Sequence, residues 1–259
     1  MEIQKNEVTN TKVTHFVYPY LCTEGEGYYD LMYSIRSLYK YFKGDFDVTL
    51  VGDKPNYYNG KYIPRIHVPK YSPQVNTLIL FDTIADIYDE FIVINDDMIL
   101  INDCTKSDFT KQYHINNDLN GFDNPNIELI DSFYTTTLLN AYTLLKSEKK
   151  PTKSFSAHVP HFIESKKLKT LISKFDLLGH EAKEQGGVPL DTLYNNYFMN
   201  RKNVLLADSI RIGIWDKVEF SKLNFNKKML NFNELGFKRN PELAKYVFNK
   251  FIQKSPLEK

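Results

Sequence analysis

Apolar and polar residues follow a helical pattern near the start of the chain, in residues 28–42, "YYDLMYSIRSLYKYF". The apolar positions, separated by four, three and four residues, are Leu31, Ile35, Leu38 and Phe42. This spacing places them on one face of a helix. Short apolar, β-branched runs at residues 13–19 and 47–53 flank the segment and predict strands. The pattern therefore predicts a strand, a helix and a second strand.

The same pattern continues further along the chain. Residues 65–71 predict a shorter strand, residues 76–90 a helix, and residues 90–96 another apolar strand. Later helices are expected at residues 133–146, 163–175, 189–200 and 240–254. The last of these begins with Asn240 as a candidate N-cap and Pro241 at the first helical position. The order of elements indicates an α/β fold with a mostly parallel central sheet flanked by helices, and a helical C-terminal part.

Three polar residues end the apolar strand at residues 90–96: Asn95, Asp96 and Asp97. Open α/β sheets bind ligands beyond the carboxyl ends of their strands. Adjacent carboxylates repel each other and are costly to desolvate, so a cation or a strong hydrogen-bond donor commonly compensates them. Hard divalent cations take oxygen ligands and can bridge a diphosphate. A solvated turn or a helix cap is the alternative.

A second candidate group surrounds a proline. The stretch "AHVPH" places His158 and His161 on either side of Pro160, which stiffens the bend. An imidazole titrates near neutral pH, so it can act as a base or as a ligand. Asp191, at the start of a predicted helix, is a candidate cap, acceptor-site base or metal partner. We interpret Trp215 as a core or edge aromatic rather than a platform for a sugar.

Composition limits the function classes. The chain has 33 Lys and Arg against 32 Asp and Glu, so no global field draws it onto nucleic acid or an anionic membrane. Cys22 and Cys104 lack metal-type spacing, and we expect reduced thiols. No apolar run reaches the roughly 18 residues of a membrane span, and no signal peptide is readable. These features predict a soluble, cytoplasmic protein.

Four segments, taken together and in order, resemble the Stealth family of sugar-phosphate transferases, which includes bacterial capsule enzymes and a GlcNAc-1-phosphotransferase. Residues 28–42 keep the tyrosine, serine and arginine positions of one family segment. Asn76, the helix after it and "FIVINDDM" are similar to the next. Residues 156–164, "SAHVPHFIE", match a histidine segment, and "KKMLNFNE" with the final "SPLEK" is similar to the last region.

The resemblance implies a GT-A-like, nucleotide-diphospho-sugar transferase fold. It implies a nucleotide-sugar donor such as a UDP-sugar, a divalent cation (Mn²⁺ or Mg²⁺), and transfer of a hexose-1-phosphate to a glycan hydroxyl, as in polysaccharide biosynthesis. We accordingly expect one catalytic domain over residues 1–259. Its donor-binding α/β half would span about residues 10–104, and its acceptor and catalytic half about residues 105–259.

The resemblance also implies roles for particular residues. Asp96 and Asp97 would hold the cation, and Asp97 would act at the donor phosphate. His158 would be the catalytic base, with His161 beside it. The residues expected to bind the donor, or to brace the loop around it, are Ser34, Arg36, Asn76 and Asn95. Asn231, in the closing segment, is a further candidate. Without the resemblance, Arg36 would be read as a solvated side chain and Asn76 as an N-cap.

The chain departs from the family at several positions. The opening strand motif is not recognisable in residues 13–27, Met32 stands for an arginine, and Phe232 stands for an aspartate. The family's phosphate-binding arginine has no counterpart, and Lys183 is the nearest cation. Lysine does not reproduce a bidentate guanidinium clamp. A second hypothesis therefore keeps the fold and donor but transfers a plain glycosyl group.

The acceptor in that second hypothesis is a saccharide or, in a viral protein, a hydroxylated base of DNA. The nearly neutral net charge disfavours nucleic acid, because duplex affinity depends largely on phosphate neutralisation. A third hypothesis, from another class, is an inactive sugar-binding scaffold. The presence of Asp96, Asp97 and His158 argues against it.

Overall fold

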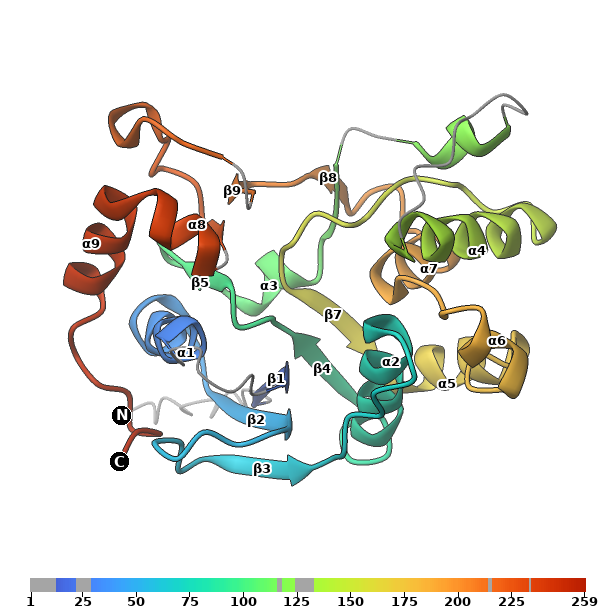
Figure 1. Cartoon of the computed structure of the whole chain (residues 1–259), viewed down its shortest axis with the longest axis horizontal. Coiled ribbons are helices and arrows are strands. Elements are labelled where there is room, and N and C mark those ends of the chain that lie inside the picture. The colour runs from blue at the N-terminus through green and yellow to red at the C-terminus, as the bar shows by residue number, and fades with distance from the viewer. Residues whose placement is uncertain (1–12, 22–28, 116–117, 124–132, 214–215, 233) are drawn as a thin grey trace, which may run out of the picture.

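The computed structural model describes residues 13–21, 29–115, 118–123, 133–213, 216–232 and 234–259. A five-stranded sheet lies at its centre (Figure 1). In spatial order its strands are β3 (Lys61–Pro64), β2 (Phe46–Gly52), β1 (Thr14–Tyr20), β4 (Glu90–Val93) and β7 (His161–Glu164). The first four are parallel, and β7 pairs antiparallel with β4. The predicted α/β fold with a mostly parallel central sheet is confirmed.

Helices cover both faces of this sheet. The alternation of side chains along β1 sends Phe16 and Tyr18 into one apolar cluster with α1 (Tyr29–Tyr41). Val17 points the other way, into a cluster with α2 (Pro73–Ile84). The predicted helical face of residues 28–42 supplies Leu31, Ile35 and Leu38 to the first cluster. Binary patterning therefore explains how this half of the chain packs.

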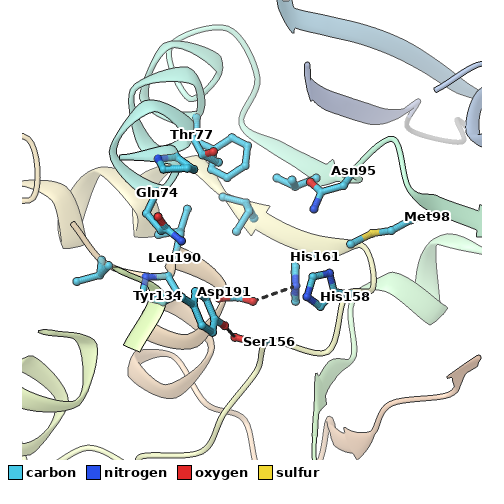
Figure 2. Close-up of a pocket in the computed structure, with 16 residues that line it drawn as sticks. Gln74, Thr77, Asn95, Met98, Tyr134, Ser156, His158, His161, Leu190 and Asp191 are labelled. Atoms are coloured by element: carbon cyan, nitrogen blue, oxygen red, sulfur yellow. Dashed lines mark hydrogen bonds and ion pairs between the residues drawn. The ribbon is translucent and has the colours of Figure 1, made fainter. Parts of the chain in front are cut away.

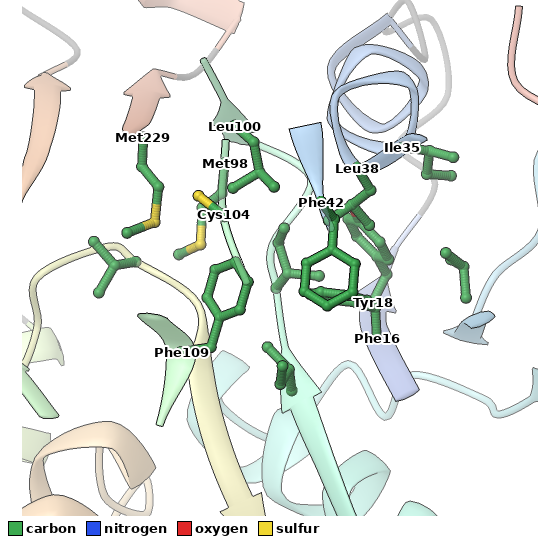
Figure 3. Packing of buried hydrophobic residues seen from close by; sticks show 14 of the residues in the cluster. Phe16, Tyr18, Ile35, Leu38, Phe42, Met98, Leu100, Cys104, Phe109 and Met229 are labelled. Carbon is green, nitrogen blue, oxygen red and sulfur yellow. The ribbon is translucent and has the colours of Figure 1, made fainter. Parts of the chain in front are cut away.

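Figure 3 shows the first cluster, in which aromatic rings meet edge to face. The Phe16 ring centroid lies 5.0 Å from that of Phe42 and 5.6 Å from that of Phe109, both nearly perpendicular. Cys104 belongs to the same cluster and is a free, buried thiol. Burial raises the pKa of this thiol to about 12, so it stays protonated. Cys22 lies outside the described residues.

Several predicted boundaries were wrong. The helix expected at residues 163–175 begins at Ser165, because the preceding residues form β7, and the helix expected at residues 76–90 ends at Ile84. The strand expected at residues 65–71 is β3, at Lys61–Pro64, because those residues pair with β2. The helix expected at residues 76–90 begins at Pro73, and Ser72 is its N-cap, with its Oγ accepting from Val75 N at 2.9 Å. The alternative role of Asn76 as an N-cap is therefore wrong.

A second layer of short strands was not predicted. β10 (Met229–Phe232) lies between β5 (Met98–Leu100) and β9 (Ser209–Ile212), antiparallel to the former and parallel to the latter. β6 (Gln112–His114) pairs with β8 (Val204–Leu206). Strands of three or four residues are too short for a periodic signal. Their pairing brings the last third of the chain to the end of β4.

The remaining helices are α3 (Lys106–Phe109), α4 (Phe133–Ser147), α5 (Ser165–Lys174), α6 (His180–Glu184), α7 (Leu190–Tyr197), α8 (Glu234–Arg239) and α9 (Pro241–Lys250), with the 3₁₀ helices η1 (Leu119–Asp123) and η2 (Phe220–Lys222). Figure 1 shows α8 and α9 on the side of α1, and α4 to α7 gathered at the opposite end. The last helix starts at Pro241 as predicted, although the Asn240 side chain bonds neighbouring loops instead of capping it. Within the described residues, no helix is both long and apolar enough to cross a membrane.

Candidate functional site

A pocket of about 220 Å³, here called the central pocket, lies where β4 ends (Figure 2). It is bounded by the first turns of α2, the segment that leads into β7, and the start of α7. Apolar side chains such as Phe81 and Ile163 form part of its lining. Its polar residues are Gln74, Thr77, Asn95, Tyr134, Ser156, His158, His161 and Asp191. The pocket occupies the sheet edge at which α/β folds bind ligands.

The two predicted histidines both line the central pocket. His161 is the first residue of β7, and its Nε2 lies 3.8 Å from Asp191 Oδ2. Burial lowers the pKa of both imidazoles, while the Asp191 carboxylate opposes the shift. Neutral imidazoles at pH 7 can accept a proton from a hydroxyl group. The site therefore contains two candidate bases, one of which lies beside a carboxylate.

The backbone at His158 is strained. Its φ of 47° lies in the left-handed region, which residues other than glycine adopt uncommonly. Such conformations cost free energy and concentrate at active sites and ligand clamps. The fold thus holds the His158 imidazole at the pocket at the expense of local backbone strain.

Asp191 lies in the first turn of α7, as the sequence predicted. Its Oδ1 accepts a hydrogen bond from Thr192 N at 2.6 Å, which leaves Oδ2 toward His161. The N-cap position belongs to Pro189, so capping is not the main task of Asp191. The structure instead places Asp191 beside a candidate catalytic base, His161, which is a position that none of its three predicted roles describes.

Tyr134 and Ser156 line the pocket but were not predicted. The Tyr134 hydroxyl donates to Ser156 Oγ at 2.6 Å. Burial and the nearby Asp191 charge raise the pKa of Tyr134, so the phenol remains a neutral donor. Ser156 is the first residue of the histidine segment, two positions before His158, which was the only signal available in the sequence. There was no such signal for Tyr134, because a tyrosine in a predicted helix usually packs against other apolar side chains.

Gln74 carries an unsatisfied group. Its side-chain oxygen is buried and has no hydrogen-bond partner among the described residues. The residue lies in the first turn of α2 and lines the central pocket (Figure 2). Buried acceptors without partners are rare in native proteins and cost about 1–3 kcal/mol. A ligand hydroxyl would satisfy this oxygen.

Asp97 is a buried carboxylate next to the central pocket, whose lining includes Asn95 and Met98 but neither Asp96 nor Asp97. It lies in the turn between β4 and β5, and its main-chain oxygen accepts from Phe232 N and Asn231 Nδ2, each at 3.1 Å. Its Oδ1 is buried and finds no partner in the part of the chain that the structure describes. Burial, with the Asp96 charge, raises the pKa of Asp97 to about 7. The fold maintains this costly group beside the central pocket.

Asp96 lies next to different neighbours. Its charge raises the pKa of Tyr18 and Tyr57, whereas Asp97 interacts with Asn231 and Arg211. No cluster of three or more His, Cys, Asp or Glu side chains that could hold a metal occurs among the described residues. Mg²⁺, however, is commonly held by one or two carboxylates together with substrate phosphates and water. The unpartnered Asp97 oxygen fits such a cation.

Asn95 and Asn231 flank this turn. The Asn95 main-chain oxygen accepts from Met98 N at 3.1 Å, and its side chain lines the central pocket. Asn231 is buried in β10 and anchors Asp97 through the bond described above. Both predicted residues are therefore near Asp97, one as part of the pocket and the other as a support.

Ser34 and Arg36 lie away from the central pocket. Ser34 is fully buried, donates to Met98 O and accepts from the Tyr18 hydroxyl at 2.8 Å, so it joins α1 to β5. Arg36 Nη2 and Nε bond the two carboxylate oxygens of Glu258 at 2.6 and 2.9 Å, and Nη1 bonds Phe251 O at 2.8 Å. This arrangement fixes the C-terminal tail, and Arg36 does not line the central pocket.

Asn76 and Lys183 also have local partners. The Asn76 side chain accepts from Val68 N at 2.8 Å and donates to Val68 O and Tyr71 O, each at 3.1 Å. It thereby holds the loop before α2. Lys183 lies in α6, with its Nζ 5.7 Å from the centroid of the Tyr71 ring, and does not line the central pocket. Trp215 lies outside the described residues.

A second pocket, of about 160 Å³, lies at the ends of β1 and β2. Its lining includes Tyr20, Asp53 and His67. It shares Pro73 and Thr77 of α2 with the central pocket. Together the two pockets extend along the carboxyl ends of the parallel strands.

The comparisons with known proteins give no family. No protein-family model matches the chain, and no curated protein matches it. Among solved structures, it is similar to mouse xyloside xylosyltransferase 1 in its apo form, with a TM-score of 0.42 and 10% identity. That match covers 86% of this chain and 99% of the other. A TM-score below 0.5 does not establish a common fold, so the function must be inferred from the site.

Proposed function

We propose that this chain is a nucleotide-sugar-dependent transferase. The observation that carries the proposal is the Asp97 carboxylate, buried with an unpartnered oxygen at the end of a central parallel strand. Beside it lies a pocket with two histidines and a carboxylate. Perturbed titratable groups that converge in a pocket are typical of catalytic sites. The GT-A-like fold and the resemblance to sugar-phosphate transferases belong to the same proposal.

The donor would extend over both pockets. Its nucleoside would occupy the second pocket, at the ends of β1 and β2, and its sugar the central pocket. The diphosphate would then lie close to Asn95, next to the turn of Asp96 and Asp97. Two adjoining pockets would accommodate the two parts of such a donor, its nucleoside and its sugar.

A divalent cation would be held by Asp96 and Asp97, with the donor phosphates as further ligands. It would supply charge neutralisation at the phosphates when bound. The protein's own part is to keep Asp97 in place through Asn231 and Phe232 N. Since Asp97 is buried and its Oδ1 has no partner among the described residues, a cation would relieve a cost that the fold carries.

In the first form of the reaction, the acceptor hydroxyl attacks the phosphorus that bears the sugar. A new P–O bond forms, the bond from that phosphorus to the bridging oxygen breaks, and a nucleoside monophosphate leaves with the electron pair. His158 takes the acceptor proton, which its lowered pKa permits because the imidazole is neutral at pH 7. His161, 3.8 Å from Asp191, would be the second base at the pocket.

The second form transfers a plain glycosyl group to a saccharide and releases a nucleoside diphosphate. It is supported by the position of Lys183, which lies outside the central pocket and cannot replace the family's arginine there. Both forms use the same donor site and differ in the atom attacked.

Product analysis separates the two forms. The protein is incubated with radiolabelled nucleotide sugars, oligosaccharide acceptors, and Mn²⁺ or Mg²⁺. A nucleoside monophosphate as product indicates sugar-phosphate transfer, and a diphosphate indicates glycosyl transfer. His158→Ala is expected to keep donor binding and lose turnover. An absence of turnover with every donor and acceptor would contradict the proposal and favour a binding scaffold.

A further inference from the structure

Arg211 lies in β9 and was not singled out by its sequence context. Strand pairing aligns it with Asn231 of β10, which in turn is aligned with Met98 of β5. Directly paired residues point to the same face of a sheet. Met98 lines the central pocket, and Asn231 donates a hydrogen bond to Asp97. Arg211 therefore lies on the same face of this sheet as a pocket residue and a residue that contacts Asp97.

The neighbours of Arg211 confirm which way it points. Ile210 and Ile212 are buried in the apolar cluster that includes residues of α9, such as Leu243 and Val247. Because side chains alternate along a strand, Arg211 must lie on the opposite face from the two isoleucines. Its side chain is exposed there, on the face toward the central pocket.

Three groups of the site lie within range of the Arg211 charge. It lowers the pKa values of Asp97, His158 and Tyr134, which come from three separate segments of the chain. The Arg211 charge therefore interacts with the turn after β4, the histidine bend and the start of α4.

The guanidinium is also unengaged. Across the residues that the structure describes, Arg211 forms no ion pair and donates no hydrogen bond. Arg36, by contrast, is fully occupied by Glu258 and Phe251 O. An arginine near a functional pocket, with all of its donors available, is suited to an anionic ligand that brings several acceptor oxygens.

We propose that Arg211 binds the donor's phosphate groups. This inference rests on the proposed function and adds a residue to it. The planar fork of a guanidinium matches two phosphate oxygens, which Lys183 could not do even if it reached the site. The phosphates would lie between Arg211 on one side and the turn of Asp96 and Asp97 on the other.

The test compares ligands that differ only in phosphate. Calorimetry at fixed Mg²⁺ measures binding of uridine, UMP, UDP and inorganic pyrophosphate to the wild type, Arg211→Gln and Arg211→Lys. Arg201→Gln, at an exposed turn, is the matched control. We expect Arg211→Gln to weaken UDP or pyrophosphate roughly 10- to 100-fold. Uridine binding should not change, Arg211→Lys should recover part of the loss, and the control should bind as the wild type does.

Three results would overturn the inference. If the wild type binds UDP or pyrophosphate and Arg211→Gln binds them equally well, Arg211 is only a solvated cation on an edge strand, and the proposed function survives. If Arg211→Gln weakens uridine as much as UDP, its effect is structural and does not involve phosphate. A wild type that binds none of these compounds or any nucleotide sugar removes the proposed function, and this inference with it.

Discussion

Asp191 and His161 come from different elements and meet in the central pocket, with Oδ2 of the carboxylate 3.8 Å from Nε2 of the imidazole. The contact joins the first turn of α7 to the first residue of β7 (Figure 2). Burial lowers the pKa of His161 and Asp191 raises it, so the carboxylate keeps the imidazole closer to its ordinary value.

Asp191→Asn should therefore lower kcat by roughly 10- to 100-fold, in the range of a general base's contribution. The amide is nearly isosteric, so donor affinity should change little. The acid limb of the pH profile should move to lower pH, because His161 loses the charge that raised its pKa. Steady-state kinetics from pH 5 to 8 measures this, with Asp103→Asn, at an exposed site, as the control. An unchanged kcat and an unchanged pH profile would exclude the role.

Asp97→Asn should stabilise the protein at alkaline pH. The carboxyl titrates at about pH 7 when folded and near 3.9 when unfolded, so the folded state binds more protons between these values. The free energy of unfolding then falls as pH rises from 4 to 7, and the full cost is present above pH 7. Without divalent cation, urea denaturation at pH 8 should show Asp97→Asn more stable than the wild type by about 2–4 kcal/mol. At pH 4 the two should be alike. Equal stability at pH 8 would show that Asp97 carries no such cost.

Gln74→Met should weaken recognition of the donor sugar without lowering the stability of the fold. The substitution removes a buried amide oxygen that has no partner in the described structure, so the free energy of unfolding should stay the same or rise. If a sugar hydroxyl satisfies that oxygen, KM for the donor should rise roughly 10-fold while the affinity for free nucleotide is kept. Thermal unfolding and kinetics with the same donor measure both effects. Loss of nucleotide affinity would contradict a role confined to the sugar.

Arg36→Met should cost stability without affecting the donor site. The Arg36 and Glu258 side chains are only 9% and 5% exposed, so removing one partner leaves a buried charge. A loss of roughly 3 kcal/mol is expected. The double variant Arg36→Met/Glu258→Met should recover part of the lost stability, because neither buried charge is then left without its partner. Denaturation curves give the stabilities, and nucleotide binding to the folded variant should equal that of the wild type. A selective loss of binding would restore Arg36 to the donor site.

The first half of the fold could be predicted because its information is local. Alternation along β1 and the helical spacing in α1 define which side chains face the core. The carboxylate pair follows an apolar strand, and the two histidines surround a proline, so both candidate groups were visible in short stretches of sequence.

The rest depends on contacts between distant segments. Glu258, 222 positions after Arg36, determines what that arginine does. Arg211 reaches the site only through the pairing of β9, β10 and β5, whose short strands have no periodic signal. Tyr134 likewise becomes a pocket residue only when α4 packs beside the histidine segment. Local patterns could not have located any of these three.

The most direct test of the central claim is cation-linked donor binding at Asp97. Calorimetry measures binding of UDP-glucose, UDP-GlcNAc and GDP-mannose to the wild type, Asp97→Ala and the control Asp103→Ala, with and without Mn²⁺. We predict that the wild type binds at least one of these donors and binds it more tightly with Mn²⁺. Asp97→Ala should lose at least about 10-fold in affinity, in line with loss of a charge-assisted ligand, and Asp103→Ala should match the wild type. A wild type that binds no donor, or an Asp97→Ala variant that binds with wild-type affinity and cation dependence, would contradict the claim.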